Sequence, residues 1–248
     1  MSASIELLGV TLDYAVYSVR AQSLRSSVMN LAVGGRFMKD QRDIAVVRAL
    51  SNIGFRVEEG DRLALIGHNG SGKTTLLKVI AGIYEPSEGM VNVQGRITSM
   101  ISLGLGMDAE ASGLQNIYNI GLMRLVRKSV IKERIQSIVD FSELGAFINL
   151  PVKTYSAGMV ARLNFAIATE LEADILVLDE WLGAGDASFH EKAADRMNRF
   201  VEKAKILVIG THSTTLVRQV CNKVCVLDGG RMSYFGPTDE YFDRLAAA

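Results

Sequence analysis

One glycine-rich stretch constrains the fold more than any other part of the chain, residues 67–75, with the sequence Gly-His-Asn-Gly-Ser-Gly-Lys-Thr-Thr. It follows an apolar run at 63–66 and precedes residues 76–80, whose composition favours a helix. In a strand, glycine-rich loop and helix of this order, the loop N–H groups and the positive end of the helix dipole point at one anion. The sequence therefore predicts a phosphate-binding P-loop, and a purely structural glycine turn is the weaker alternative.

The residues of this loop are expected to bind a nucleoside triphosphate together with Mg²⁺. The Lys73 ammonium can reach the β- and γ-phosphates, and the Thr74 hydroxyl can ligate the metal. The predicted nucleotide-binding residues of the loop are Gly67, Asn69, Gly70, Ser71, Gly72, Lys73, Thr74 and Thr75.

Two carboxylates, Asp179 and Glu180, follow the apolar run 175–178 directly. A buried parallel strand delivers the side chains that follow it to the sheet edge where ligands bind. Asp179 can hold Mg²⁺ directly or through water, and Glu180 can orient and deprotonate a water aimed at the γ-phosphate. Alone, this pattern is typical of a solvated strand end. In a chain that carries a P-loop, the catalytic interpretation is favoured.

A histidine and an aromatic residue complete the predicted site. His212 follows the apolar run 206–209 and is expected to contact the γ-phosphate, although a lone histidine is more often structural. His68 and His190 have no identifiable partner and are interpreted as structural. Tyr14 follows a predicted first strand at 5–12 and is expected to stack on the nucleobase, with Tyr17 as the alternative.

Composition bounds the class of protein. The chain has 248 residues, 48% hydrophobic, with 27 basic and 27 acidic side chains, so it gives no support for a general nucleic-acid binder. It carries neither a signal peptide nor an apolar run of the roughly 20 residues that span a bilayer. Its two cysteines, Cys221 and Cys225, favour free buried thiols in a reducing compartment. We expect a cytoplasmic protein that can still sit on a membrane as a subunit.

The element pattern predicts one α/β domain over 1–248. Alternating strands and helices after residue 175 favour a mostly parallel core sheet, preceded by an antiparallel β portion and a helical subdomain at about 103–170. Residues 15–48 form a less regular insertion. Within it, the spacing of apolar residues predicts an amphipathic helix at 23–33. That helix packs either on its own domain or at a membrane or subunit interface.

The chain resembles the nucleotide-binding domain of an ABC transporter. The resemblance rests on four features that occur in the order typical of that domain: the P-loop, the segment Tyr155–Met159, the carboxylate pair and His212. It covers essentially the whole chain. The resemblance implies an ABC-type P-loop ATPase that uses ATP and Mg²⁺, with Glu180 and His212 as catalytic residues. It also implies a homodimer. Ser156, Ala157, Gly158 and Met159 match the signature motif, which binds the γ-phosphate held by the other subunit. Gly185 and Asp186 match the D-loop at the dimer interface.

A narrower similarity concerns exported polysaccharides. The segments at 103–107, 141–145, 155–163 and 179–186 are similar to ATPase subunits of exporters for O-antigen, capsular polysaccharide or teichoic acid. This similarity implies a separate transmembrane permease dimer, a lipid-linked glycan as cargo, no nucleic acid, and a peripheral position on the cytoplasmic face of the inner membrane. Because O-antigen exporters carry a helix near the channel entrance in a matching insertion, it favours the interface interpretation of 23–33.

The chain departs from the wider family at one position. The glutamine that usually begins the helical insertion has no counterpart near Ser102 and Leu103, which supports the narrower similarity but leaves the coupling residue unnamed. Few residues follow the last predicted strand, so no C-terminal carbohydrate-binding domain is expected. The alternatives are an ABC ATPase for a different exported substrate and a soluble ABC ATPase outside transport.

Overall fold

The computed structural model describes residues 2–16, 37–39, 45–101, 104, 106–171, 173–180 and 187–247. The chain divides into two compact units, one built from residues 1–97, 177–181 and 205–248 and the other from 98–176 and 182–204. The predicted helix at 23–33, Tyr17, and the D-loop residues Gly185 and Asp186 lie outside the described residues.

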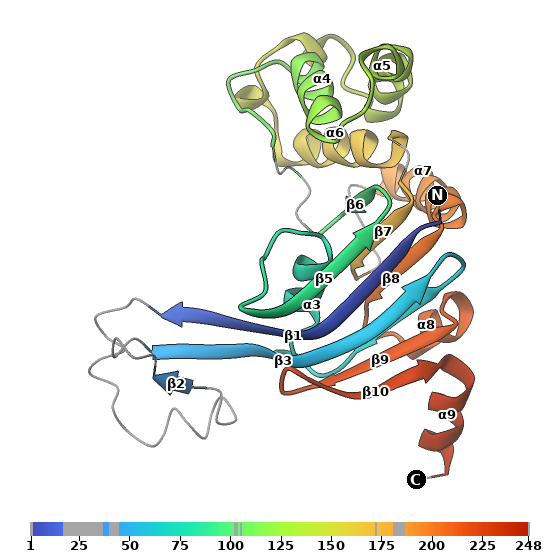
Figure 1. Ribbon diagram of the computed structural model, residues 1–248. Coiled ribbons are helices and arrows are strands. Elements are labelled where there is room, and N and C mark those ends of the chain that lie inside the picture. Colours follow the sequence, from blue (N-terminus) through green and yellow to red (C-terminus); the bar gives the residue numbers. More distant parts are fainter. Residues whose placement is uncertain are drawn as a thin grey trace. The chain divides into compact units, whose positions relative to one another are not determined.

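Strands and helices alternate along much of the chain, coloured in sequence order in Figure 1. The strands are β1 (Ser4–Val16), β2 (Phe37–Lys39), β3 (Ala45–Glu58), β4 (Arg62–Ile66), β5 (Glu88–Gln94), β6 (Ile97–Ser99), β7 (Ile175–Asp179), β8 (Ile206–Gly210), β9 (Lys223–Asp228) and β10 (Arg231–Pro237). The helices are α3 (Lys73–Ile80), α4 (Gly113–Met123), α5 (Lys128–Ser142), α6 (Ala157–Glu170), α7 (Ala187–Lys203), α8 (Thr214–Val220) and α9 (Thr238–Ala246), with 3₁₀ turns η1 (Gly145–Asn149) and η2 (Val152–Thr154).

The core sheet has six strands in the order β10-β9-β4-β8-β7-β6. Strand β4 is parallel to both β8 and β9, and β10 closes the edge antiparallel to β9. All residues of β8 are buried, as are the first four of β7. Strands buried on both faces are continuous apolar runs in the sequence, which is why β7 and β8 could be predicted from it. The predicted fold class, with its mostly parallel core sheet, is confirmed.

A second, antiparallel sheet has the order β2-β3-β1-β5. Strands β1 and β3 pair from Ser4 opposite Glu58 to Val16 opposite Ala45, and Figure 1 shows them as two long neighbouring arrows. The first strand thus continues beyond the predicted end at Leu12, so Tyr14 lies within β1 rather than after it. The physical reason is cross-strand pairing, since both Arg48 nitrogens Nε and Nη2 donate to the Asp13 carboxylate at 2.8 Å. Strand β2 was not predicted.

The second unit is helical around α4, α5 and α6. Helix α4 begins with a capping box, in which the Ser112 hydroxyl accepts from the Gln115 N–H and the Gln115 side chain accepts from the Ser112 N–H. Such reciprocal capping satisfies N–H groups that have no partner within the helix. Of the helices within the described part of the chain, none is long and apolar enough to cross a bilayer.

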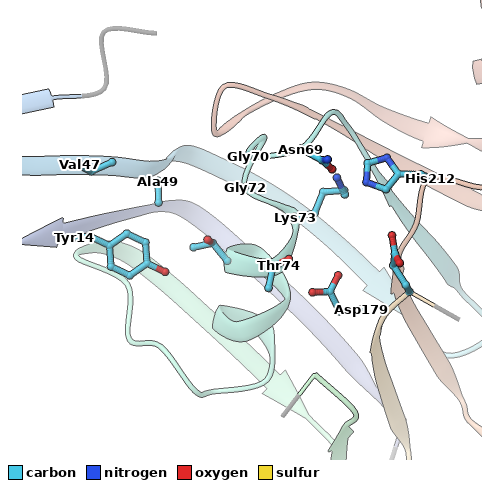
Figure 2. A pocket seen from close by; sticks show the side chains of 12 residues that line it. Tyr14, Val47, Ala49, Asn69, Gly70, Gly72, Lys73, Thr74, Asp179 and His212 are labelled. Atoms are coloured by element: carbon cyan, nitrogen blue, oxygen red, sulfur yellow. The ribbon is translucent and has the colours of Figure 1, made fainter. Parts of the chain in front are cut away.

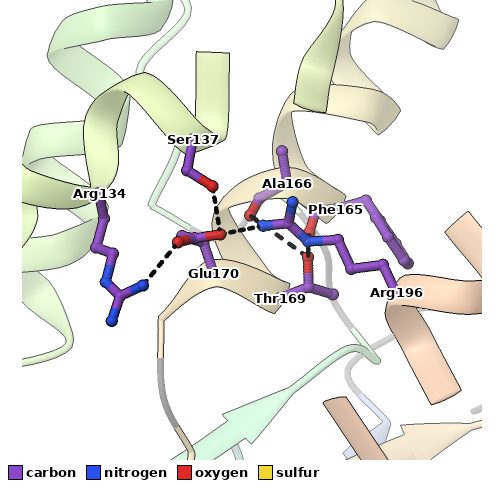
Figure 3. Close-up of polar contacts among 7 residues, drawn as sticks. All are labelled: Arg134, Ser137, Phe165, Ala166, Thr169, Glu170 and Arg196. Atoms are coloured by element: carbon purple, nitrogen blue, oxygen red, sulfur yellow. Dashed lines mark hydrogen bonds and ion pairs between the residues drawn. The ribbon is translucent and has the colours of Figure 1, made fainter. Parts of the chain in front are cut away.

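One ion-pair cluster joins three helices of this unit (Figure 3). Arg196 on α7 donates from Nη2 to Glu170 Oε2 at 2.5 Å and from Nε to Thr169 Oγ1 at 2.7 Å. From α5, Arg134 and Ser137 donate to the same Glu170 carboxylate at 3.2 and 2.9 Å. The side chains of Arg196 and Glu170 are only 14% and 11% exposed, so the pair is shielded from water. Burial lowers the pKa of Arg196, and the Glu170 charge opposes that effect.

Aromatic rings extend the same cluster. The Arg196 guanidinium lies 4.0 Å from the centroid of the Phe141 ring, a cation–π geometry. Phe141 stacks on Phe165 at 5.9 Å and meets Phe189 edge-on at 5.4 Å. The core of the helical unit is therefore both apolar and charged, with Arg196 in contact with both parts.

We predict that Arg196→Ala lowers the free energy of unfolding by about 3 kcal/mol, because it leaves the Glu170 carboxylate buried without its nearest cation. Denaturant unfolding followed by circular dichroism measures the change. Arg199→Ala is the matched control, since Arg199 lies on the same helix and donates to an exposed backbone carbonyl, that of Asp195, at 3.3 Å. Equal midpoints for the two variants would contradict the prediction.

Candidate functional site

A cleft of about 470 Å³ lies within the first unit, at the end of the P-loop. Figure 2 shows Tyr14, Val47 and Ala49 on one side of it, Asp179 and His212 on the other, and the loop with Lys73 between them. The cleft is lined by Tyr14, Val47, Ala49, Asn69, Gly70, Gly72, Lys73, Thr74, Thr75, Asp179, Glu180 and His212. All the predicted nucleotide-site residues of the first unit except Gly67 and Ser71 thus line a single cavity.

Close backbone packing explains two glycines of the loop, Gly67 and Gly72. A Cβ at position 67 would lie 2.3 Å from the Leu227 carbonyl oxygen, which only glycine avoids. Gly72 has φ +109°, and a Cβ there would lie 3.1 Å from the Ala49 carbonyl oxygen. Ser71 is fully buried and its backbone carbonyl accepts from the Gly230 N–H at 2.8 Å. Gly67 and Ser71 therefore shape the loop from beneath, while Asn69 and Gly70 between them line the cleft.

Lys73 is the first residue of α3 and lies folded against its own loop. Its ammonium donates to the carbonyls of Gly67 at 2.6 Å and His68 at 3.2 Å, and the residue is 8% exposed. Burial lowers the pKa of Lys73, while the charges of Asp179 and Glu180 raise it. The cation is thus held by two carbonyls of the P-loop at the wall of the cleft.

The neighbouring β9–β10 turn braces the loop from the other side. The Gly230 carbonyl accepts from the Ser51 N–H at 2.8 Å, so the turn bridges the P-loop and β3. His68 Nε2 lies 3.1 Å from Asp228 Oδ1 on an exposed surface. The sequence suggested no partner for His68, since Asp228 lies 160 residues away.

The carboxylate pair stands at the end of β7. Asp179 is partly buried and Glu180 exposed in the cleft wall. Glu180 has φ +67°, a left-handed conformation that costs an L-residue about 1 kcal/mol or more. Its N–H donates to the Gly210 carbonyl at 2.7 Å, which ties the end of β7 to the end of β8. Because His212 follows Gly210 by two residues, this bond places Glu180 and His212 on adjoining strand ends.

The structure adds two residues that the sequence analysis missed. Val47 lies opposite Tyr14 in the β1–β3 ladder, and Ala49 follows it on the same strand. Both line the apolar side of the cleft. An alternating strand pattern marks such residues as half-buried, but only the cross-strand register shows that they face the same cavity as Tyr14.

The predicted signature residues belong to the helical unit. Ser156 caps α6, its hydroxyl accepting from the Met159 N–H at 3.2 Å. Ser156, Ala157 and Gly158 are exposed, and a Cβ at Gly158 would meet only the Ser156 hydroxyl at 3.9 Å. The helix N-terminus is thus open to solvent. Its predicted role toward a second subunit stays a prediction.

The two sides of the cleft suit the two ends of a nucleoside triphosphate. The phenol ring of Tyr14 with Val47 and Ala49 offers a flat apolar surface for a base, and Lys73 with the loop offers donors for phosphates. The Thr74 hydroxyl and the Asp179 carboxylate are the hard oxygen donors with which proteins hold Mg²⁺ beside substrate phosphates. These features define a P-loop nucleotide-binding protein.

Comparison with known proteins identifies the family. The profile described as "ABC transporter" matches residues 50–183. The O-antigen export system ATP-binding protein RfbE of Yersinia enterocolitica is 41% identical over 227 residues, which cover 92% of this chain and 95% of that protein. RfbB of Klebsiella pneumoniae, also named an O-antigen export system ATP-binding protein, is 34% identical over 249 residues, 100% of this chain and 99% of that protein. The chain belongs to the ABC transporter family of ATP-binding subunits.

Two further comparisons extend this picture. The teichoic acids export ATP-binding protein TagH of Bacillus cereus is 37% identical over 243 residues, which cover 98% of this chain but 41% of that protein. Among solved structures, an ATP binding subunit of an ABC transporter superposes with a TM-score of 0.68 at 20% identity, covering 98% of this chain and 93% of that one. The dimeric ATP-binding cassette MJ0796 bound to ADP and Pi gives 0.65 at 19% identity, covering 94% and 98%. The predicted family, ABC fold and ATPase class are confirmed.

Gly210 offers a test of the site geometry. A Cβ at this position would lie 3.1 Å from Asp179 Oδ1 and 3.0 Å from Leu77 Cδ1, so Gly210→Ala must displace the carboxylate. We expect ATP hydrolysis to fall roughly tenfold, since small misplacements of catalytic groups are costly. Steady-state ATPase assays measure this loss. Gly54→Ala is the control, because a Cβ there has its nearest contact at 3.5 Å. Similar ATPase rates in both variants would refute the prediction.

Proposed function

We propose that the chain is the ATP-hydrolysing subunit of an exporter that moves a lipid-linked polysaccharide of the O-antigen type across the inner membrane. The observation that carries this proposal is the full-length similarity to RfbE and RfbB, which bear the name of O-antigen export systems. The nucleotide cleft supports the proposed ATP hydrolysis. The assignment of the exported polymer depends on the names of the relatives.

The cleft residues divide the chemistry among them. Lys73 and the loop N–H groups would bind the phosphates and stabilise the charge that develops on them. Thr74 and Asp179 would hold Mg²⁺, which when bound neutralises charge on the β- and γ-phosphates. Glu180 would accept a proton from the attacking water, and His212 would hydrogen-bond the γ-phosphate. Tyr14 would stack on the adenine.

The proposal includes partners that complete the site. Two copies of the chain would sandwich two ATP molecules, with Ser156 and Gly158 of one copy facing the phosphates bound by the other copy. The solved neighbour MJ0796 is dimeric, which supports this arrangement. The exposed, capped N-terminus of α6 supplies free N–H groups suited to an anion. The subunit would act at the cytoplasmic face of the membrane with a transmembrane permease dimer.

A second candidate cargo has its own support. TagH proteins, at 37–42% identity, are named for teichoic acid export, although the chain spans only 36–41% of their length. The shared chemistry is a lipid-linked polymer, and the two candidates differ in the polymer alone.

We predict that Glu180→Gln abolishes turnover but keeps ATP binding. Without the carboxylate base, the bound ATP persists and holds two copies together, so the variant should elute as a dimer in ATP and as a monomer without it. Size-exclusion chromatography with light scattering and an ATPase assay measure both effects. ATPase activity equal to that of the unmodified protein would remove Glu180 from its assigned role. Glu59→Gln, an exposed glutamate on the β3–β4 turn, is the control.

The cargo is tested with a candidate permease, which we would seek among the membrane proteins encoded next to this chain. Co-expression should place the chain in the membrane fraction, and the purified complex should retain lipid-linked glycan whose addition raises the ATPase rate. The Glu180→Gln complex should bind the glycan without that rise. A chain that stays out of the membrane fraction in the presence of this protein would count against a transport role. Mass spectrometry of the retained lipid decides between O-antigen and teichoic acid precursors.

A further inference from the structure

A second tyrosine stands beside the proposed base-stacking residue. The rings of Tyr14 and Tyr84 have centroids 5.7 Å apart and planes at 83°, an edge-to-face pair. Such pairs are favourable because the positive edge of one ring meets the negative face of the other. A perpendicular partner occupies at most one face of Tyr14, so the other face remains available to the cleft that Tyr14 lines.

Tyr84 is fixed to the helix that carries the P-loop lysine. It follows the end of α3, and the N–H groups of Ile83 and Tyr84 both donate to the Lys78 carbonyl, at 2.9 and 3.3 Å. The Lys78 ammonium lies 5.2 Å from the centroid of the Tyr84 ring. Backbone and side chain of Lys78 therefore hold this tyrosine against α3.

Tyr14, by contrast, belongs to a different element. It lies on β1 near the far end of the β1–β3 ladder, opposite Val47. Besides Tyr84, it contacts α3 through the Thr75 side chain. Burial raises the pKa of the Tyr14 hydroxyl, and the hydrogen bond with Thr75 lowers it in part. The ring is thus connected to the phosphate-binding helix by Thr75 and by Tyr84.

We propose that Tyr84 is a positioning residue for the nucleobase, holding the Tyr14 ring at the distance from the P-loop that a nucleoside triphosphate spans. This inference rests on the proposed stacking of adenine on Tyr14. The phosphates are fixed by the loop at the start of α3 and the base by a ring on β1. Affinity for the whole nucleotide then requires that β1 and α3 keep their spacing, and Tyr84 joins the two directly.

The test compares ligands with and without a base. In Tyr84→Ala, we expect the Kd for ATP to rise roughly three- to tenfold, as for the loss of one aromatic pair. The Kd for inorganic tripolyphosphate, which has no base, should stay unchanged. Tyr84→Phe keeps the ring and should bind ATP nearly as the unmodified protein does. Isothermal titration calorimetry on the full chain measures each value.

Three results would overturn the proposal. One is an unchanged ATP affinity in Tyr84→Ala, and another is an equal loss for ATP and tripolyphosphate, which would indicate general damage to the loop. The third is loss of affinity in Tyr241→Ala, the matched control. Tyr241 pairs with Tyr234 at 5.4 Å and is absent from the cleft lining. If Tyr84→Ala does not fold, as judged by circular dichroism, Tyr84→Leu replaces it with the same expectations.

Tyr14→Ala separates this inference from the base-stacking proposal. If Tyr14→Ala weakens ATP binding and Tyr84→Ala does not, Tyr14 stacks on the base without help from Tyr84, and only the positioning role fails. If Tyr14→Ala leaves ATP affinity unchanged, the base-stacking proposal itself is wrong and the role of Tyr84 falls with it.

Discussion

The structure depends on close backbone contact around the P-loop. A Cβ at Gly67 would lie 2.3 Å from the Leu227 carbonyl oxygen, and one at Gly230 would lie 2.4 Å from that of Ala49. Three segments far apart in the chain, the P-loop, β3 and the β9–β10 turn, therefore meet through close backbone contacts. Since packed backbones cannot give way as side chains do, the loop's N–H groups are aimed before any ligand arrives. Such preorganisation avoids a reorganisation cost at the moment of catalysis.

Backbone geometry also positions the proposed catalytic residues at the edge of the core sheet. Glu180 adopts a left-handed conformation that an isolated chain would avoid, and a hydrogen bond from its N–H to the Gly210 carbonyl offsets that strain. The bond joins the strand that ends in the carboxylates to the strand that leads to His212. Gly210 has a second function, because its missing side chain leaves space for the Asp179 carboxylate. One glycine thus sets the position of the proposed metal ligand, Asp179, and of the proposed base, Glu180.

Most elements of the fold and most cleft residues could be predicted because their signals are local. Buried strands are unbroken apolar runs, and the P-loop is one continuous segment. What could not be predicted depends on distant partners. Tyr14 lies inside β1 because Asp13 pairs with Arg48, which is 35 residues away, and no local pattern reveals that pairing. Val47 and Tyr84 also lie far from Tyr14 in the sequence, and only the folded structure brings them next to it. Likewise, Asp228, the partner of His68, lies 160 residues away at the end of β9.

The lining of the cleft accounts for the choice of nucleotide, whereas the choice of exported polymer must be made at another site. Relatives named for O-antigen export and for teichoic acid export match this chain at 32–42% identity, so one nucleotide-binding design accompanies two different polymers. In the proposed function, each residue that lines the cleft serves a base, a phosphate or a metal, so none of them would distinguish the two polymers. Under this proposal, the surfaces that contact the permease would select the polymer. A site that binds only the nucleotide can stay the same among relatives that export different polymers.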